Sequence, residues 1–132
     1  MSRIFILILS VFITGITAEA TQGKVSSMEE EQLAPKYLYK VISKEDWQKS
    51  IESGYVMPSS LDQAFIHLAK EDQISHVTEK FWKNKDYLVL TLLTEKLNGK
   101  LVYETNPGGS AKYYHLYNGN IPLDAVIKTT AK

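Results

Sequence analysis

The order of the predicted elements indicates an α+β domain, with two helices packed on a largely antiparallel sheet. The order is strand, helix, strand, helix and then only strands, whereas a doubly wound parallel sheet would continue to alternate. The strongest apolar run of the folded part, residues 87–93, is typical of a central strand. Turns rich in Gly and Asn divide the residues after it. These observations favour one domain covering residues 37–132.

Composition narrows the class of protein. The chain has 132 residues, and 15 Lys+Arg balance 15 Asp+Glu. This length fits a single domain. A neutral balance argues against extended nucleic-acid binding, which needs a basic surface. The sequence contains no cysteine, which excludes disulfides, thiolate metal ligands and a Cys nucleophile.

Residues 1–20 have the pattern of a secretory signal peptide. Arg3 precedes an apolar run at 4–13, and the small residues of an A-x-A cleavage site follow at 18–20. The run is shorter than the roughly 20 residues that cross a bilayer, which favours cleavage before Thr21 over a retained anchor. We therefore expect an exported protein, periplasmic or secreted, that has no membrane segment after cleavage.

Residues 21–36 are predicted to be a flexible tether. They are polar, contain three consecutive glutamates at 29–31 and include Pro35. Their few apolar side chains cannot bury enough surface to offset the entropy of ordering. The folded domain is therefore expected to begin at Tyr37.

The domain is predicted to open with a strand and a helix. Residues 37–42 are aromatic and β-branched, which favours a strand. Ser43 is a suitable N-cap for a helix that carries Trp47 and Ile51 on its apolar face. Gly54 suits the left-handed residue that closes such a helix.

A loop at 55–64 separates this pair from a second strand and helix. Residues 65–68 are a short buried strand by composition. Residues 70–82 predict a helix with an acidic first turn. Its apolar stripe is formed by Ile74, Val77 and Phe81.

The second half is predicted to contain strands alone. They cover residues 87–93, 100–105, 113–117 and 121–129. Turn signals between them are Gly99, the glycine-rich segment 106–110 and the Asn-Gly-Asn segment 118–120. We expect the last strand to return along the same sheet.

Two of the three histidines lie inside short apolar strands, where a polar ring needs a partner. Strand alternation places His67 on one face with Phe65, and His115 on one face with Tyr113 and Tyr117. If both rows face a common cleft, they form a pocket lined by Tyr and His.

We take His67, His115 and Glu104 as candidate catalytic residues. For each histidine the alternative is a core group hydrogen-bonded to backbone or to a carboxylate. Glu104, an acidic residue in the middle of a strand, is placed to orient a histidine or to act as a base, and the alternative is a solvent-facing carboxylate. No metal-binding spacing such as H-E-x-x-H occurs, so no metal is predicted.

Short motifs between residues 37 and 127 resemble those of the bacterial domain of unknown function 952. They include Y-K-V-I at 39–42, F-I-H-L at 65–68, Y-E at 103–104 and H-L-Y at 115–117. Members of that family resemble small ADP-ribosyltransferase-type folds, related in shape to toxins and to RNA 2′-phosphotransferases that use NAD. The resemblance implies an ADP-ribosyltransferase-like fold with NAD as a candidate ligand. It adds, as candidate ligand-binding residues, Tyr39, Lys40, Gln73 and Tyr117.

The chain departs from the family pattern at several positions. Ala64 and Ala69 stand where G-F-I-H-L-S has Gly and Ser, and Tyr114 replaces a Pro. The catalytic triads of the wider superfamily, H-Y-E and R-S-E, do not map onto the chain. The first strand has no His or Arg, and the last has no Glu.

Two functional hypotheses follow. The first is an enzyme-like domain that binds a nucleotide or NAD-like small molecule in the Tyr/His cleft. The second is a non-catalytic exported module that binds a ligand or a protein partner, with the strand at 37–42 or at 113–117 available for pairing.

Overall fold

The computed structural model describes residues 33–132. The predicted signal peptide and most of the predicted tether lie outside the described residues. At the described end of that tether, Thr94 is bound to both Pro35 and Lys36. Its Oγ1 donates to the Pro35 carbonyl oxygen at 2.6 Å, and its backbone N–H donates to the Lys36 carbonyl oxygen at 3.0 Å. These two residues are therefore attached to the domain.

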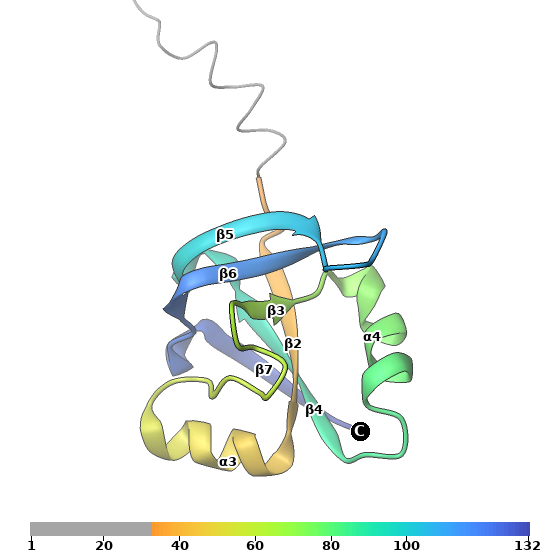
Figure 1. Cartoon of the computed structure of the whole chain (residues 1–132). Helices are drawn as coiled ribbons and strands as arrows, with labels where there is room; N and C mark the ends of the chain where they lie inside the picture. Colours follow the sequence, from red (N-terminus) through yellow and green to blue (C-terminus); the bar gives the residue numbers. More distant parts are fainter. Residues whose placement is uncertain (1–32) are drawn as a thin grey trace, which may run out of the picture. The chain divides into compact units, whose positions relative to one another are not determined.

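The first of two antiparallel sheets has the strand order β2-β4-β7 (Figure 1). It consists of β2 (Tyr37–Ser43), β4 (Tyr87–Leu93) and β7 (Val126–Ala131). The prediction of a central strand at 87–93 is confirmed, because β4 pairs with a strand on each side.

The second sheet has the order β3-β6-β5. It consists of β3 (Ile66–Leu68), β6 (Lys112–Asn120) and β5 (Asn98–Thr105). The α+β class with two helices and antiparallel pairing is confirmed, but the strands form two sheets and not one. Because β6 is the middle strand, the expectation that residues 113–117 offer a free edge to a partner is wrong.

An antiparallel bridge joins the two sheets. The Tyr39 N–H donates to the Ala69 carbonyl oxygen at 2.9 Å, and the Ala69 N–H donates back to Tyr39 at 2.8 Å. The start of the domain therefore lies beside the end of β3. This brings residues 39–40 next to the strand that carries His67.

Helix α3 (Lys44–Ser53) begins and ends where its capping residues predict. The Ser43 Oγ accepts from the Asp46 N–H at 3.0 Å, and Gly54 has a φ of 90°. Both signals are local, which is why they could be recognised in the sequence.

The predicted apolar face of α3 is wrong at Ile51, whose side chain is exposed. The buried residue is Ser50, whose Oγ donates to the Asp46 carbonyl oxygen and accepts from the Met57 N–H, both at 2.7 Å. The loop after the helix thus folds back onto Ser50. At this position of the helix, hydrogen bonds to the loop take the place of the apolar packing that was expected.

The helix predicted at 70–82 starts as a 3-10 turn, η2 (Glu71–Gln73), and continues as α4 (Ile74–Phe81). No residue of α4 is fully buried, and Phe81 is exposed, so the predicted stripe does not enter the core. The helix lies beside the sheets, not across one of them (Figure 1). Its half-buried side is thereby left to line a cleft.

The turn predicted at 118–120 is wrong, because these residues continue β6. The pairing of β5 with β6 shifts register between Asn98 and Lys100, and Gly99 there has a φ of 124°. The backbones meet so closely that a Cβ on Gly119 would lie 1.7 Å from the Asn98 carbonyl oxygen. The Asn-Gly segment therefore lies at an irregularity in the pairing of β5 with β6.

The strand predicted at 121–129 does not return along the sheet of β6. A 3-10 turn, η4 (Leu123–Ala125), redirects the chain, and β7 then pairs with β4 in the other sheet. That β7 pairs with β4 could not be predicted from the local sequence pattern, because the two strands are distant in sequence.

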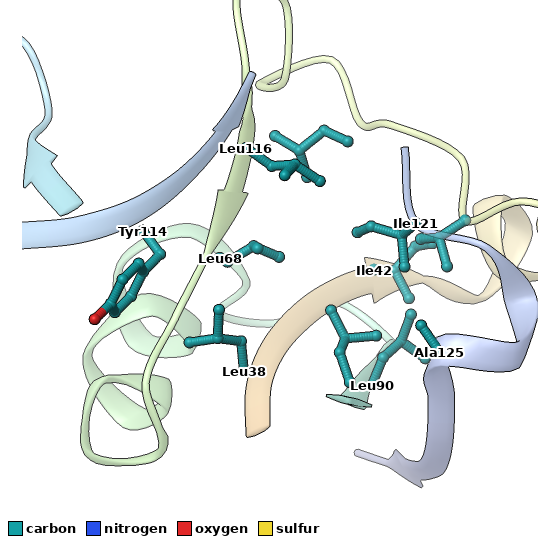
Figure 2. Packing of buried hydrophobic residues seen from close by; sticks show 11 residues of the cluster. Leu38, Ile42, Leu68, Leu90, Tyr114, Leu116, Ile121 and Ala125 are labelled. Carbon is teal, nitrogen blue, oxygen red and sulfur yellow. The ribbon is translucent and has the colours of Figure 1, made fainter. Parts of the chain in front are cut away.

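The core lies between the two sheets (Figure 2). Leu38, Ile42 and Leu90 come from the first sheet, and Leu68 and Leu116 from the second. All are essentially inaccessible to water, so the two sheets are held at a fixed separation by apolar packing. Within residues 33–132, no helix is long and apolar enough to cross a membrane.

Candidate functional site

A cleft of about 540 Å³ opens beside the joint between the two sheets. Its walls come from residues 39–41 of β2, the loop at 59–62, the end of β3, one side of α4 and the β5–β6 connection at 106–111. That connection lies near the start of the second helix, because Gln73 Nε2 donates to the Lys112 carbonyl oxygen at 2.8 Å (Figure 1). The volume is in the range of small-molecule sites.

His67 lines this cleft. Its Nδ1 lies 2.9 Å from Asp62 Oδ1, and the same oxygen accepts from the His67 backbone N–H at 3.0 Å. An ionised carboxylate only accepts hydrogen bonds, so Nδ1 carries a proton. Within residues 33–132, Nε2 has no hydrogen-bond partner, and the side chain is 37% exposed. In the neutral ring, the lone pair of Nε2 is therefore available to a ligand.

Asp62 is a buried carboxylate held from several directions. Its Oδ2 lies 2.7 Å from Lys40 Nζ and accepts from the Ser59 N–H at 2.9 Å. The exposed fraction of the side chain is 1% for Asp62 and 4% for Lys40. Burial alone would raise the pKa of Asp62, but the hydrogen bond from His67 and the charge of Lys40 outweigh it and hold that pKa well below its usual value. We call this set the Lys40–Asp62–His67 array.

A second network surrounds His115, which is fully buried. Its Nδ1 lies 2.7 Å from Glu104 Oε2, and its Nε2 lies 2.8 Å from Asn106 Oδ1. The Tyr117 hydroxyl donates to the same Glu104 oxygen. Both ring nitrogens are thus occupied, and His115 has no free lone pair for a ligand.

The hydrogen bonds of this network shift two pKa values in opposite directions. The pKa of Glu104 is lowered, first by the hydrogen bond from Tyr117 and then by that from His115. The pKa of Tyr117 is raised, first because its hydroxyl is bound to Glu104 and then by burial. Both shifts favour a carboxylate that accepts from a neutral phenol.

The two networks meet across the β3–β6 pair. His67 and His115 are register partners, and their ring centroids are 5.4 Å apart. The ring of Phe65 stacks on His115 at 3.9 Å. Asn106, the last member of the second network, lines the cleft into which His67 faces. The arrangement can therefore link the buried network to a bound ligand.

The structure brings some of the predicted site residues together and places others apart. Tyr39, Lys40 and His67 line the cleft. His115, Glu104 and Tyr117 form the second network, outside the cleft lining. Gln73 also lies outside it, and the amide accepts from the Lys70 N–H at one end and donates to Lys112 at the other.

Sequence analysis missed Asp62 and Asn106. Asp62 stands in a predicted loop five residues before His67, a spacing that belongs to no motif. Asn106 was assigned only to a turn. A histidine in an apolar strand predicts that a partner exists, but tertiary structure decides which residue it is. Within residues 33–132, no three metal-ligating side chains gather into a candidate metal site.

Comparison with known proteins supplies a fold relative and a family. The crystal structure of protein CC0527 from Caulobacter crescentus is similar, with 26% identity and a TM-score of 0.64 over 72% of this chain and 84% of that one. Its solution NMR structure gives 25% identity and a TM-score of 0.60, over 73% and 84% of the two chains. No curated protein matches the chain.

The family match covers the candidate site except for Tyr39 and Lys40. A model of the family described as protein of unknown function (DUF952) matches residues 41–129. This range is more than half of the chain and includes both Asp62 and the two strand histidines. The resemblance noted from the F-I-H-L and H-L-Y motifs is thereby confirmed at the level of the family, and the chain belongs to the DUF952 family.

Proposed function

We propose that this domain binds a small nucleotide-like ligand in the cleft, with His67 as the polar anchor. The observation that carries the proposal is that the two nitrogens of the His67 ring differ in their hydrogen bonding. Nδ1 is fixed by buried Asp62, while Nε2 has no partner among residues 33–132, and the residue lines the cleft. A buried ion pair that orients one exposed ring nitrogen is typical of a binding or catalytic site.

The cleft walls suit a ligand with an aromatic ring and an anionic group. Tyr39, Trp82 and Tyr113 line it, and aromatic side chains stack on nucleobases and similar rings. Lys80 adds a cationic side chain on the side formed by α4. Lys40 supplies no free charge, because its ammonium is bound to Asp62.

NAD is the first ligand to test. The ADP-ribosyltransferase-like fold and its link to NAD are proposals based on the family resemblance. The aromatic and cationic walls of the cleft support NAD as a ligand. The proposal includes export, which is supported by the signal-peptide pattern of residues 1–20.

Amide chemical-shift mapping of the protein during titration with NAD, ADP-ribose and nicotinamide tests the proposal. We expect saturable shifts at Tyr39, at His67 and in the segment 106–111, and none in α3, which does not line the cleft. A response to nicotinamide alone would mean that the cleft binds only the nicotinamide ring of NAD. A response to ADP-ribose alone would mean that it binds only the ADP-ribose part. No shift with any of the three at millimolar concentration would refute the proposal.

A second candidate is a non-catalytic module that binds another protein. Ile51 and Ile127 are 48% and 51% exposed and line the same shallow hollow with Trp47 and Val126. Exposed apolar side chains that adjoin one another are common at interaction surfaces. Loss of all ligand response in the titration, with the fold intact, would leave this candidate as the one to pursue.

A further inference from the structure

The orientation of His67 is fixed by a carboxylate that cannot turn. One oxygen of Asp62 accepts two hydrogen bonds from His67, while the other accepts from Lys40 and from the Ser59 N–H. With both oxygens engaged and the side chain buried, the Oδ1 lone pair stays aimed at Nδ1. The ring is therefore held in the form that bears a proton on Nδ1 and a lone pair on Nε2.

Lys40 helps to keep the Asp62 carboxylate ionised. A carboxyl group as buried as Asp62 would favour its protonated form if no cation were near. Lys40 Nζ, at 2.7 Å, keeps Asp62 ionised and so keeps it an acceptor. The pair thus acts on the ligand only through the ring that it orients.

The other two described histidines lack this combination. His115 is fully buried and both its nitrogens are bound. His76, an exposed residue of α4 that also lines the cleft, has no hydrogen-bond partner within residues 33–132 to fix its ring. In the described part of the chain, only His67 combines a place in the cleft lining with one nitrogen fixed by a carboxylate and the other without a hydrogen-bond partner.

We propose that His67 is a general base and that Asp62, held by Lys40, is its positioning residue. This inference deepens the proposed function, because it names what the cleft does to the hydroxyl group of a bound ligand or to a water beside it. The O–H bond breaks, its proton forms a bond to Nε2, and the electron pair stays on the oxygen, which becomes the stronger nucleophile. The imidazolium that results is stabilised at Nδ1 by Asp62, and it returns the proton to the leaving group.

The substrate class follows from this chemistry. The ligand carries an electrophilic centre that an activated oxygen can attack, such as a phosphoester or the glycosidic carbon of a nucleotide. Water as the nucleophile gives hydrolysis, and a sugar hydroxyl gives transfer. No external oxidant, reductant or metal is required for either step.

The first test is a long-range ¹H–¹⁵N spectrum of the histidine rings in the full chain, without any ligand. We expect His67 to show the Nδ1–H form. A neutral His67 with its proton on Nε2 would overturn the inference. Because no ligand is present, this outcome is independent of the titration, and a ligand could still bind to a protein whose His67 is not a base.

The second test is acylation by diethyl pyrocarbonate, which attacks an unprotonated imidazole nitrogen, followed by peptide mass mapping. We expect His67 to react at least tenfold faster than buried His115 in the same molecule. The matched variant His67→Asn keeps an amide N–H close to the Nδ1 position and lacks Nε2, so modification of this peptide should disappear. Equal rates at His67 and His115 would overturn the inference.

The third test addresses the positioning role. Asp62→Asn should change the His67 ring form and lower its acylation rate several-fold, whereas Asp124→Asn, whose side chain is 73% exposed, should change neither. If Asp62→Asn does not fold, the ring form of the wild-type protein still decides. An unchanged ring form and rate in a folded Asp62→Asn variant would remove Asp62 from the mechanism.

Discussion

At Asp62, a cation, two backbone amides and an imidazole converge on one buried carboxylate. Its neighbours outweigh the cost of burial and keep the pKa low. In the unfolded chain the same group has an ordinary pKa, so the two states differ in proton uptake. The ionisation of Asp62 therefore makes the free energy of unfolding depend on pH in the acidic range.

We predict that Asp62→Asn removes part of the acid sensitivity of folding. As pH falls through about 4, the unfolded chain takes up a proton at Asp62 before the folded chain does. The stability due to the ionised carboxylate is thus fully present above that pH and is lost below it, by about 1.4 kcal/mol for each unit of pKa difference. Urea unfolding between pH 7 and pH 3 measures this as a flatter profile in the variant.

The same variant should be less stable at neutral pH. Removing one partner of a buried ion pair leaves Lys40 without its counter-charge, which costs about 3–5 kcal/mol. Asp124→Asn is the control, because its contact with Lys96 is long, at 3.9 Å, and exposed. Equal pH profiles for wild type and Asp62→Asn would mean that Asp62 is not preferentially ionised in the folded state.

Individual site residues could be predicted only where the alternation of side chains along one strand indicated them. Alternation placed His67 and His115 on faces that meet as register partners, and Glu104, expected to orient a histidine or to act as a base, lies 2.7 Å from His115. Asp62 and Asn106 belong to loops, where no periodicity marks a side chain that turns inward. Their roles depend on contacts made after the sheets assemble.

Among the elements, the β5–β6 pair contains the tightest backbone contact that we describe. We predict that Gly119→Ala lowers the free energy of unfolding by about 3 kcal/mol or more, because a methyl group there must displace the Asn98 main chain. Chemical denaturation measures the loss.

Gly109→Ala is the matched control for this substitution. Its new Cβ would meet the Asn106 carbonyl oxygen at 3.4 Å, an ordinary contact distance. We expect a change below about 1 kcal/mol. A Gly119→Ala variant as stable as Gly109→Ala would show that β5 and β6 can separate at this point without cost.

Elements whose signals are local were predicted well, and those set by distant contacts were not. The ends of α3 follow from Ser43 and Gly54, which act on their own helix. The Asn-Gly segment at 118–120 is also a strong local turn signal, and Asn118 has a left-handed φ of 52°, but the segment remains part of β6, which pairs with β5 on both sides of Asn118. Tertiary contact overrides local preference there, and it likewise buries Ser50 where Ile51 was expected.

For the whole molecule, the order of elements predicted the class but not the division into two sheets. An α+β order is compatible with either arrangement, because the choice depends on pairing between strands that are distant in sequence. The cleft is a product of that choice. It lies at the joint made by Tyr39 and Ala69, where no single element forms it alone.

The expected export gives a prediction for the full chain. Expressed in a bacterial host, the protein should be recovered from the periplasm or the medium with Thr21 as its first residue, as N-terminal sequencing can establish. Ala18→Glu should block processing, because the cleavage site requires small residues. Recovery of the unprocessed chain from the cytosol, beginning at Met1, would contradict this prediction.

The position of β4 also determines when the fold can be completed. Its partners are β2, which precedes it, and β7, which is synthesised after every other strand of the domain. While a ribosome is still translating residues 126–131, one edge of the central strand has no partner. The first sheet therefore cannot be completed until translation has passed β7, and up to that time the unpaired edge of β4 is open to pairing with another chain.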